Sequence, residues 1–207
     1  MHCLSLQYSK SLHHIIKTYG QRNISGCYDS LYTELAKLIL SKEPKVVLEF
    51  GCGDAYLLRR VRDLNNEIKL IGCDFSRSQI KNAKVLLKDA ELDCQNIKAT
   101  TYADNECDVA VGVSVLMYLN PEELHCALIE IKRISQIAII VEYDCRYFND
   151  DQKILFHSGN DGRFDYNFEN ECLKVGFTNV VSNRCEQFWD TDINVLGELG
   201  LSITIAE

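Results

Sequence analysis

The sequence predicts an α/β fold with a doubly wound, mostly parallel sheet and helices on both of its faces. Short apolar runs, such as 46–50 and 137–143, alternate along the chain with stretches of helical periodicity, such as 76–90. Such runs are typical of parallel strands that are buried on both faces. The alternation also supplies the crossover helices that successive parallel strands need. We expect the 207 residues to form a single domain.

The individual elements are predicted from periodicity and from residues that begin or end helices. Leucines at 31, 35 and 38 predict an amphipathic helix over 30–41 that ends before Pro44. Asn120, Pro121 and two glutamates form a strong helix start, and Gly176 stands at a C-cap position. The other elements are expected as strand 46–50, helix 55–64, strand 69–73, helix 76–90, a short strand and loop over 95–103, strands 108–113 and 137–143, helix 168–175, and strands 177–181 and 201–206.

The composition narrows the classes of partner. A formal net charge of −8 argues against nucleic acid or an anionic membrane as the main partner, since both require a basic face. No apolar run approaches the roughly 20 residues of a membrane span. The first residues lack the charged and apolar regions of a signal peptide. We therefore expect a cytoplasmic protein that binds neither nucleic acid nor a membrane.

The ten cysteines are interpreted as free, buried thiols. No pair has the C-x-x-C spacing that structural zinc needs. Several stand inside apolar runs, such as Cys73 and Cys107, where reduced cysteine behaves as a small hydrophobic residue. The cysteines thus predict a reducing compartment and no metal site.

A glycine loop, Gly51-Cys52-Gly53, follows the first predicted strand. Glycine at this point lets the main chain turn sharply and lie directly against a ligand. The dinucleotide fingerprint G-x-G-x-x-G would require a third glycine at Tyr56. Asp54 also places a carboxylate near the start of the next helix, where it would repel a diphosphate. The loop therefore favours a ligand with a cationic or neutral group over a dinucleotide.

Glu49-x-Gly51-x-Gly53 resembles motif I of the class I S-adenosylmethionine (SAM) dependent methyltransferases. The family usually has a third glycine where this chain has Ala55. The resemblance implies a Rossmann-like, seven-stranded sheet whose last strand is antiparallel, with Glu49, Gly51, Cys52 and Gly53 at the cofactor. It also implies SAM as the cofactor and methyl transfer to an oxygen or nitrogen of a small-molecule substrate.

Other cofactor contacts are expected at the carboxyl ends of the later strands. Asp74 lies about 20 residues beyond the loop, the spacing at which an acidic residue meets the ribose hydroxyls. The alternative is that Asp74 caps the next helix, for which Ser76 is better placed. Phe75 could stack on the adenine, and Ser114 follows the strand at 108–113. The family's acidic adenine ligand is replaced by Lys98 or Ala99, so backbone groups or Thr100 are expected there.

The substrate side is expected to involve the long polar segment 144–167, a length of loop that is usually functional or disordered. His157 is the candidate general base, since imidazole titrates near neutral pH; the alternative is a solvated histidine. Arg22 and Arg163 could bind a substrate carboxylate or phosphate, or be ordinary surface charges. Candidate pocket walls, which could equally serve packing, are Tyr19, Tyr28, Tyr118 and Tyr143.

These expectations divide the single domain into four parts. They are an N-terminal helical cap at 1–43, a SAM-binding core at 44–143, the substrate-covering segment at 144–167, and a C-terminal helix and strand pair at 168–207. Two alternatives stay open from the sequence. One is a methyltransferase-like domain that binds SAM or a partner without catalysis, and the weaker one is a nucleotide-dependent oxidoreductase.

Overall fold

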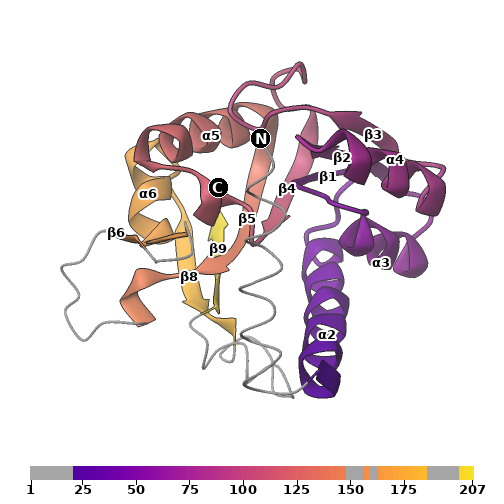
Figure 1. Ribbon diagram of the computed structural model, residues 1–207. Coiled ribbons are helices and arrows are strands. Elements are labelled where there is room, and N and C mark those ends of the chain that lie inside the picture. Colours follow the sequence, from indigo (N-terminus) through magenta and orange to yellow (C-terminus); the bar gives the residue numbers. More distant parts are fainter. Residues whose placement is uncertain (1–20, 148–155, 159–162, 186–200) are drawn as a thin grey trace.

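The computed structural model describes residues 21–147, 156–158, 163–185 and 201–207 (Figure 1). A single sheet of seven strands runs through it in the order β3-β2-β1-β4-β5-β9-β8. The strands are β1 (Val46–Phe50), β2 (Lys69–Asp74), β3 (Glu91–Cys94), β4 (Cys107–Val113), β5 (Ser135–Tyr143), β8 (Val180–Arg184) and β9 (Leu201–Ala206). The pairs among β1 to β5 are parallel, and β9 is antiparallel to both of its neighbours. The predicted mostly parallel sheet with an antiparallel last strand is confirmed.

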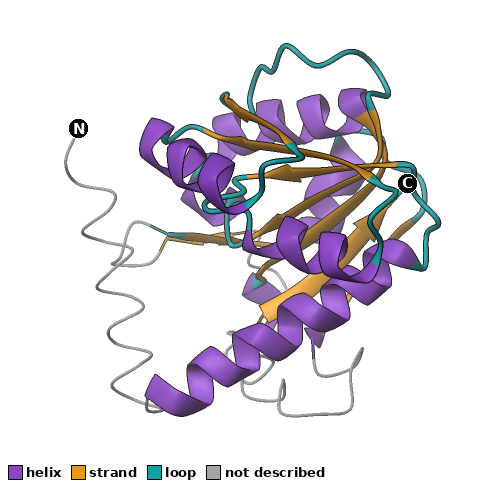
Figure 2. Cartoon of the chain, turned by 90° about the vertical axis from the view of Figure 1, so that its right-hand side faces the viewer, coloured by secondary structure: helices purple, strands orange, loops and turns teal. Residues whose placement is uncertain are grey.

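Helices cover both faces of this sheet, as Figure 2 shows. One face packs against α2 (Gln21–Leu40), α3 (Tyr56–Leu64) and α4 (Arg77–Leu86) through buried residues such as Leu35, Leu58 and Ile80. The other face packs against α5 (Pro121–Ile134) and α6 (Phe168–Lys174) through residues such as Leu128 and Phe168. Alternate side chains of each central strand enter the two cores, which explains why these strands read as unbroken apolar runs.

Several predicted boundaries differ from the structure. The strand expected within 95–103 is wrong: β3 occupies Glu91–Cys94, and Asn96 and Ala99 form only an isolated bridge. Leu92 is buried between two exposed acidic side chains, as suits a strand at the edge of a sheet. Because the strand has a single buried residue, a search for apolar runs does not find it. The helix expected over 76–90 ends at Leu86, because Leu87 turns to an extended conformation as its side chain enters the core.

Two further elements are shifted, and a 3-10 helix and a hairpin were not foreseen. Helix α2 begins at Gln21 instead of residue 30, and β8 spans Val180–Arg184 instead of 177–181. The segment 144–167 contains a short 3-10 helix, η2 (Cys145–Tyr147), and a hairpin of β6 (Phe156–Ser158) and β7 (Phe164–Tyr166). Strand β7 and the bridge from Asp144 to Tyr166 place this hairpin beside the end of β5.

The strand ends that matter for a site lie along one edge of the sheet. The register pairs Phe50 with Cys73 and Val113 with Val141, so the residues that follow β1, β2, β4 and β5 emerge side by side. In open α/β sheets, ligands bind at the carboxyl ends of the strands, where the strand order reverses direction. Here the order reverses between β1 and β4. The fold therefore directs attention to Gly51, Asp74 and Ser114.

Candidate functional site

The glycine loop between β1 and α3 has a left-handed backbone at three alternate residues. Gly51, Gly53 and Ala55 have φ angles of 65°, 53° and 62°. The Cys52 N–H donates to the Cys73 carbonyl at 3.0 Å and the Ala55 N–H to the Cys52 carbonyl at 2.7 Å, which fixes the loop against β2 and closes its turn. Ala55 thus adopts the conformation that a glycine would take most readily. The departure from the usual third glycine is accommodated without a change of the loop's path.

The two glycines of the loop have different surroundings. A Cβ on Gly51 would lie 2.4 Å from Cγ2 of Val115, so this position has no room for a side chain. A Cβ on Gly53 would meet no heavy atom of the described residues within 4 Å. The main chain at Gly53 therefore faces open space at the carboxyl edge of the sheet, where a ligand could lie against it.

Glu49 is a buried carboxyl group beneath this loop, in β1. Burial raises its pKa well above the ordinary value; the Leu58 backbone N–H opposes that shift, and the carboxylates of Asp54 and Asp74 add to it. Its Oε2 atom has no hydrogen-bond partner among the described residues. A buried acid with one unused oxygen favours a cationic or hydrogen-bond-donating group of a ligand.

Asp74 ends β2 and is bound to the loop. Its Oδ2 accepts the Gly53 N–H at 3.0 Å and its Oδ1 accepts the Ser76 N–H at 2.8 Å. Ser76 is the N-cap of α4, since its hydroxyl accepts the Gln79 N–H. The structure therefore gives the capping role to Ser76, and each Asp74 oxygen keeps a further lone pair for a ligand hydroxyl. The neighbouring Phe75 is 71% exposed.

The candidate adenine residues are held by α5. Thr100 donates from its N–H and its hydroxyl to Oε1 of Glu130, at 2.7 and 2.6 Å, while Lys98 pairs with Glu123 at 2.5 Å. The pKa of Glu130 is lowered to about 2, chiefly by hydrogen bonds from Arg133. Burial opposes this shift, and the hydrogen bonds from Thr100 add to it. The Thr100 hydroxyl proton is thus committed to Glu130, which leaves its oxygen as an acceptor for an amino group.

The ends of β4 and β5 meet at Glu142, a residue that the sequence reasoning missed. Glu142 is completely buried, and its Oε1 accepts the N–H groups of Val115 and Leu116, both at 2.6 Å. The preceding Ser114 has a φ of 55°, and its Oγ has no partner among the described residues. The available signal was an ionisable residue at the end of the apolar run 137–141.

The structure brings two of the candidate substrate residues together. The Arg163 guanidinium lies 4.6 Å from the centre of the Tyr143 ring, and its Nε lies 3.2 Å from Oδ1 of the buried Asp165. Tyr118 is half-buried in the 3-10 helix η1 (Leu116–Tyr118), on the chain that leaves β4. Arg163 and Tyr143 therefore form a cation–π contact at the end of β5.

The other predicted substrate residues lie outside the described part of the chain. This applies to the whole of Tyr19 and to the side chains of Arg22, Tyr28 and His157. The backbone of His157 is placed in β6, paired with Asp165 of β7. The roles assigned to these residues stay predictions.

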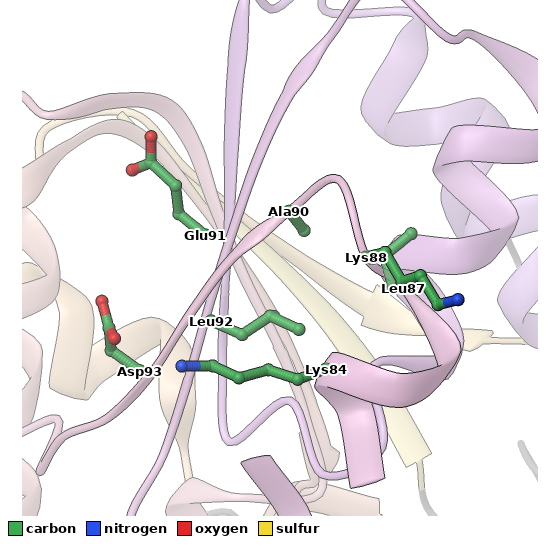
Figure 3. A pocket seen from close by; sticks show the side chains of 7 residues that line it. All are labelled: Lys84, Leu87, Lys88, Ala90, Glu91, Leu92 and Asp93. Carbon is green, nitrogen blue, oxygen red and sulfur yellow. The ribbon is translucent and has the colours of Figure 1, made fainter. Parts of the chain in front are cut away.

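An open hollow beside α4 and β3 does not belong to this site. It is lined by residues 84, 87 and 88 at the end of the helix and by residues 90–93 (Figure 3). None of the residues that line it comes from the glycine loop or from the ends of β4 and β5. Its lining includes two lysines and two acidic residues, and in Figure 3 the Lys84 side chain extends toward Asp93. We therefore place the candidate site at the glycine loop.

The described residues add three findings about metals, thiols and membranes. They contain no group of three or more His, Cys, Asp or Glu side chains arranged to hold a metal ion. The eight cysteines whose side chains are described are all free. No helix within the described ranges has both the length and the apolar character that crossing a membrane requires.

Comparison with known proteins agrees with this geometry. Residues 47–136, which run from β1 to β5, match the family described as a methyltransferase domain. No curated protein sequence matches the chain. The matched segment contains Glu49, the glycine loop, Asp74 and Ser114.

Solved structures share the fold at low sequence identity. An O-methyltransferase-like protein from Nostoc punctiforme superposes with a TM-score of 0.67 at 13% identity, covering 88% of this chain and 57% of its own. The 1,6-didemethyltoxoflavin N1-methyltransferase of Burkholderia thailandensis, solved with its ligand and S-adenosylhomocysteine, superposes with a TM-score of 0.63 at 14% identity. The match covers 97% of this chain and 88% of that one. A structure of the complex between the Haloferax volcanii Trm112 methyltransferase activator and a methyltransferase gives a TM-score of 0.61 at 16% identity. The match covers 78% of this chain and 81% of that one.

The reversed strand order and the glycine loop at the sheet's carboxyl edge define a Rossmann-like protein that binds a nucleoside cofactor. Residues 47–136 form a class I SAM-dependent methyltransferase domain, since they match the methyltransferase-domain family and lie in this fold. The cofactor of this family is SAM. The residues at the loop fit that cofactor. Glu49 could receive its ammonium group and Asp74 its ribose, and the open side of Gly53 leaves room for it against the main chain.

Proposed function

We propose that the protein transfers the methyl group of SAM to an oxygen or nitrogen atom of a small molecule. The observation that carries the proposal is the unpartnered Oε2 of buried Glu49 beneath the open glycine loop. A dinucleotide would bring a diphosphate to this point, whereas SAM brings a cationic amino acid. The carboxylates of Asp54 and Asp74 near Glu49 disfavour a diphosphate and favour the cationic ligand.

Each cofactor residue has a distinct part in this proposal. Glu49 receives the ammonium group, and the main chain at Gly51, Cys52 and Gly53 lies against the ligand. Asp74 accepts from the ribose hydroxyls, and the exposed Phe75 covers one face of the adenine. Thr100 contributes an acceptor oxygen near the adenine amino group, and Ser114 borders the methyl group with its unpartnered hydroxyl.

Bound SAM supplies a methyl carbon that the sulfonium already activates. The protein's main tasks are therefore to align the acceptor for an in-line displacement and to exclude water. Tyr118 and Tyr143 lie at the ends of β4 and β5, where they can form walls for the acceptor. Arg163 stacks on Tyr143 and can orient an anionic group of the acceptor.

The acceptor must lose a proton if it is a hydroxyl or an ammonium group. We assign that step to His157, whose backbone lies in β6 opposite Asp165. Replacing His157 by Gln is expected to lower the turnover number about 100-fold while the affinity for SAM stays unchanged. Loss of cofactor binding in that variant would assign the residue to the cofactor site instead.

Calorimetry with S-adenosylhomocysteine tests the cofactor part of the proposal. Wild-type protein is expected to bind it, and Asp74→Ala is expected to weaken binding at least tenfold, because the ribose loses its acceptor. Equal binding by the two proteins would remove Asp74 from the site. Transfer of label from SAM to a set of small hydroxyl and amine compounds then tests catalysis. Binding without transfer to any of them would favour the non-catalytic alternative.

A further inference from the structure

Glu142 links the two halves of the site and has no part in the proposed function. It is the last residue but one of β5, a completely buried carboxyl group on the strand face shared with Ala138 and Ile140, which α5 and α6 cover. Its Oε1 accepts two consecutive backbone N–H groups, from Val115 and Leu116, both at 2.6 Å. A carboxyl oxygen that holds two N–H groups in this way fixes the path of the chain that donates them.

That chain is the one that presses on the glycine loop. Ser114 turns it sharply with a φ of 55°, and the next residue is Val115. The Val115 methyl carbons occupy the space in which a Cβ of Gly51 would lie, 2.4 and 2.7 Å from that position. Glu142 is therefore connected to the cofactor loop through a single intermediate residue.

Strand β5, which carries Glu142, also lies beside β7 of the candidate substrate segment. Burial is the main cause of the raised pKa of Glu142, and the charge of Asp165 in β7 adds to it; Asp165 is itself paired with Arg163. The Glu142 Oε2 atom has no hydrogen-bond partner among the described residues. Ser202 of β9 also donates to the Glu142 backbone carbonyl, at 3.2 Å. The Glu142 side chain is thus bound to the start of η1, and its backbone to β9.

We propose that Glu142 is a positioning residue, which holds the Ser114–Leu116 turn against the Gly51 loop and so sets the affinity for the cofactor. The proposal rests on the proposed function, because it takes the loop to be the SAM site. What the turn requires is an acceptor oxygen at the distance of Oε1. A negative charge is not required, because burial favours the neutral carboxyl group at this point.

The first test compares substitutions at Glu142 by calorimetry with S-adenosylhomocysteine. Glu142→Gln keeps the acceptor oxygen and is expected to bind within threefold of wild type. Glu142→Asp is one methylene shorter and cannot reach both N–H groups, and Glu142→Leu has no acceptor, so both are expected to bind at least tenfold more weakly. Full affinity in Glu142→Asp and Glu142→Leu would overturn the proposal, as would a loss in Glu142→Gln equal to that in Glu142→Leu.

A second test asks whether Glu142 acts through Val115. Val115→Ala is expected to weaken binding, and the double variant Glu142→Asp/Val115→Ala is expected to bind no more weakly than Glu142→Asp alone. Additive losses would contradict the proposed connection. The double variant therefore measures the coupling between the two residues, since losses at sites that act through one shared contact are not additive.

Ser202→Ala is the matched control. It removes a buried hydrogen bond to the backbone of the same residue and leaves the Glu142 side chain intact. It is expected to lower the unfolding temperature without changing the affinity for S-adenosylhomocysteine. Reduced affinity in this control would show that any disturbance of β5 suffices and would overturn the proposal. If the wild-type protein itself bound no S-adenosylhomocysteine, the proposed function would fail and not this connection alone.

Discussion

Gly51 and Gly53 stand two residues apart and are required for different reasons. An alanine methyl group at 51 would collide with Val115, whereas at 53 it would meet no atom within 4 Å from the part of the chain that the structure describes. A left-handed alanine costs roughly 1 kcal/mol relative to glycine. Gly53→Ala is therefore expected to lose about 1 kcal/mol in unfolding free energy, yet to bind S-adenosylhomocysteine at least tenfold more weakly. Urea unfolding and calorimetry measure the two effects.

Gly51→Ala supplies the comparison for that variant. Its collision with Val115 is expected to cost clearly more unfolding free energy than Gly53→Ala, and Val115→Ala in the same chain is expected to recover part of the loss. Undiminished binding by Gly53→Ala would show that the space beside residue 53 is not used by the ligand.

Glu142 gives the stability of the fold a distinct pH dependence. Burial, opposed by the N–H groups of Leu116, Val115 and Met117, raises its pKa to about 8 from 4.5. Between those two values the folded state keeps the proton that the unfolded state has lost, so stability falls as pH rises. Relative to Glu142→Gln, the wild type is expected to lose at most about 1.4 kcal/mol per pH unit across this window. Urea unfolding at pH 5 to 8.5 measures it, and a constant difference would show that the pKa is not raised.

The sequence predicted the position of those candidate residues that follow strand ends, but it missed those that depend on packing. Gly51, Asp74 and Ser114 could be placed at one edge because each follows a recognisable strand. Glu142 was absorbed into an apolar strand, since nothing local distinguishes a buried acid from one that emerges into solvent. The left-handed Ala55 was also hidden, because its conformation is imposed by the loop and not by its side chain.

At the level of elements, Glu130 fastens the loop after β3 to helix α5. It accepts two hydrogen bonds from Thr100 and is paired with Arg133 at 2.7 Å, which lowers its pKa to about 2. The contribution of the ionised Glu130 to folding stability is therefore complete above the unfolded pKa of 4.5 and is lost as pH falls through about 2. Glu130→Gln is expected to destabilise the protein by about 1–3 kcal/mol at pH 7 and by much less near pH 2.

Glu67→Gln is the matched control for that variant, since Glu67 is exposed and lies outside this network. It is expected to change the unfolding free energy by less than about 0.5 kcal/mol at either pH. A loss in Glu130→Gln that did not change between pH 7 and pH 3 would contradict the lowered pKa.

Long periodic elements were predictable, and the exposed edge of the sheet was not. The central strands and α5 are set by apolar patterns and by the capping box of Asn120 and Glu123, both of which can be read locally. Strand β3 contributes a single buried residue, Leu92, so its existence depends on pairing with β2. The end of α4 likewise depends on Leu87 reaching the core. Tertiary contacts decided both boundaries.

For the whole molecule, ligand binding should appear as thermal stabilisation. S-adenosylhomocysteine at 100 times its dissociation constant adds about 2.7 kcal/mol to the unfolding free energy. For a chain of this size that corresponds to a rise of roughly 5–10 °C in Tm. Calorimetric melting with and without the ligand measures the shift, and Asp74→Ala is expected to show much less of it. A shift with NAD in place of S-adenosylhomocysteine would favour the oxidoreductase alternative.

The position of β9 determines when the sheet can be completed during synthesis. Strand β8 leaves the ribosome before β9, yet among the described strands its single partner is β9, which lies between β5 and β8. Until residues 201–206 emerge, the nascent chain presents the bare edge of β5 and an unattached β8. Open strand edges invite pairing with other chains. Translation that stalls before residue 201 should therefore yield a species that depends on chaperones.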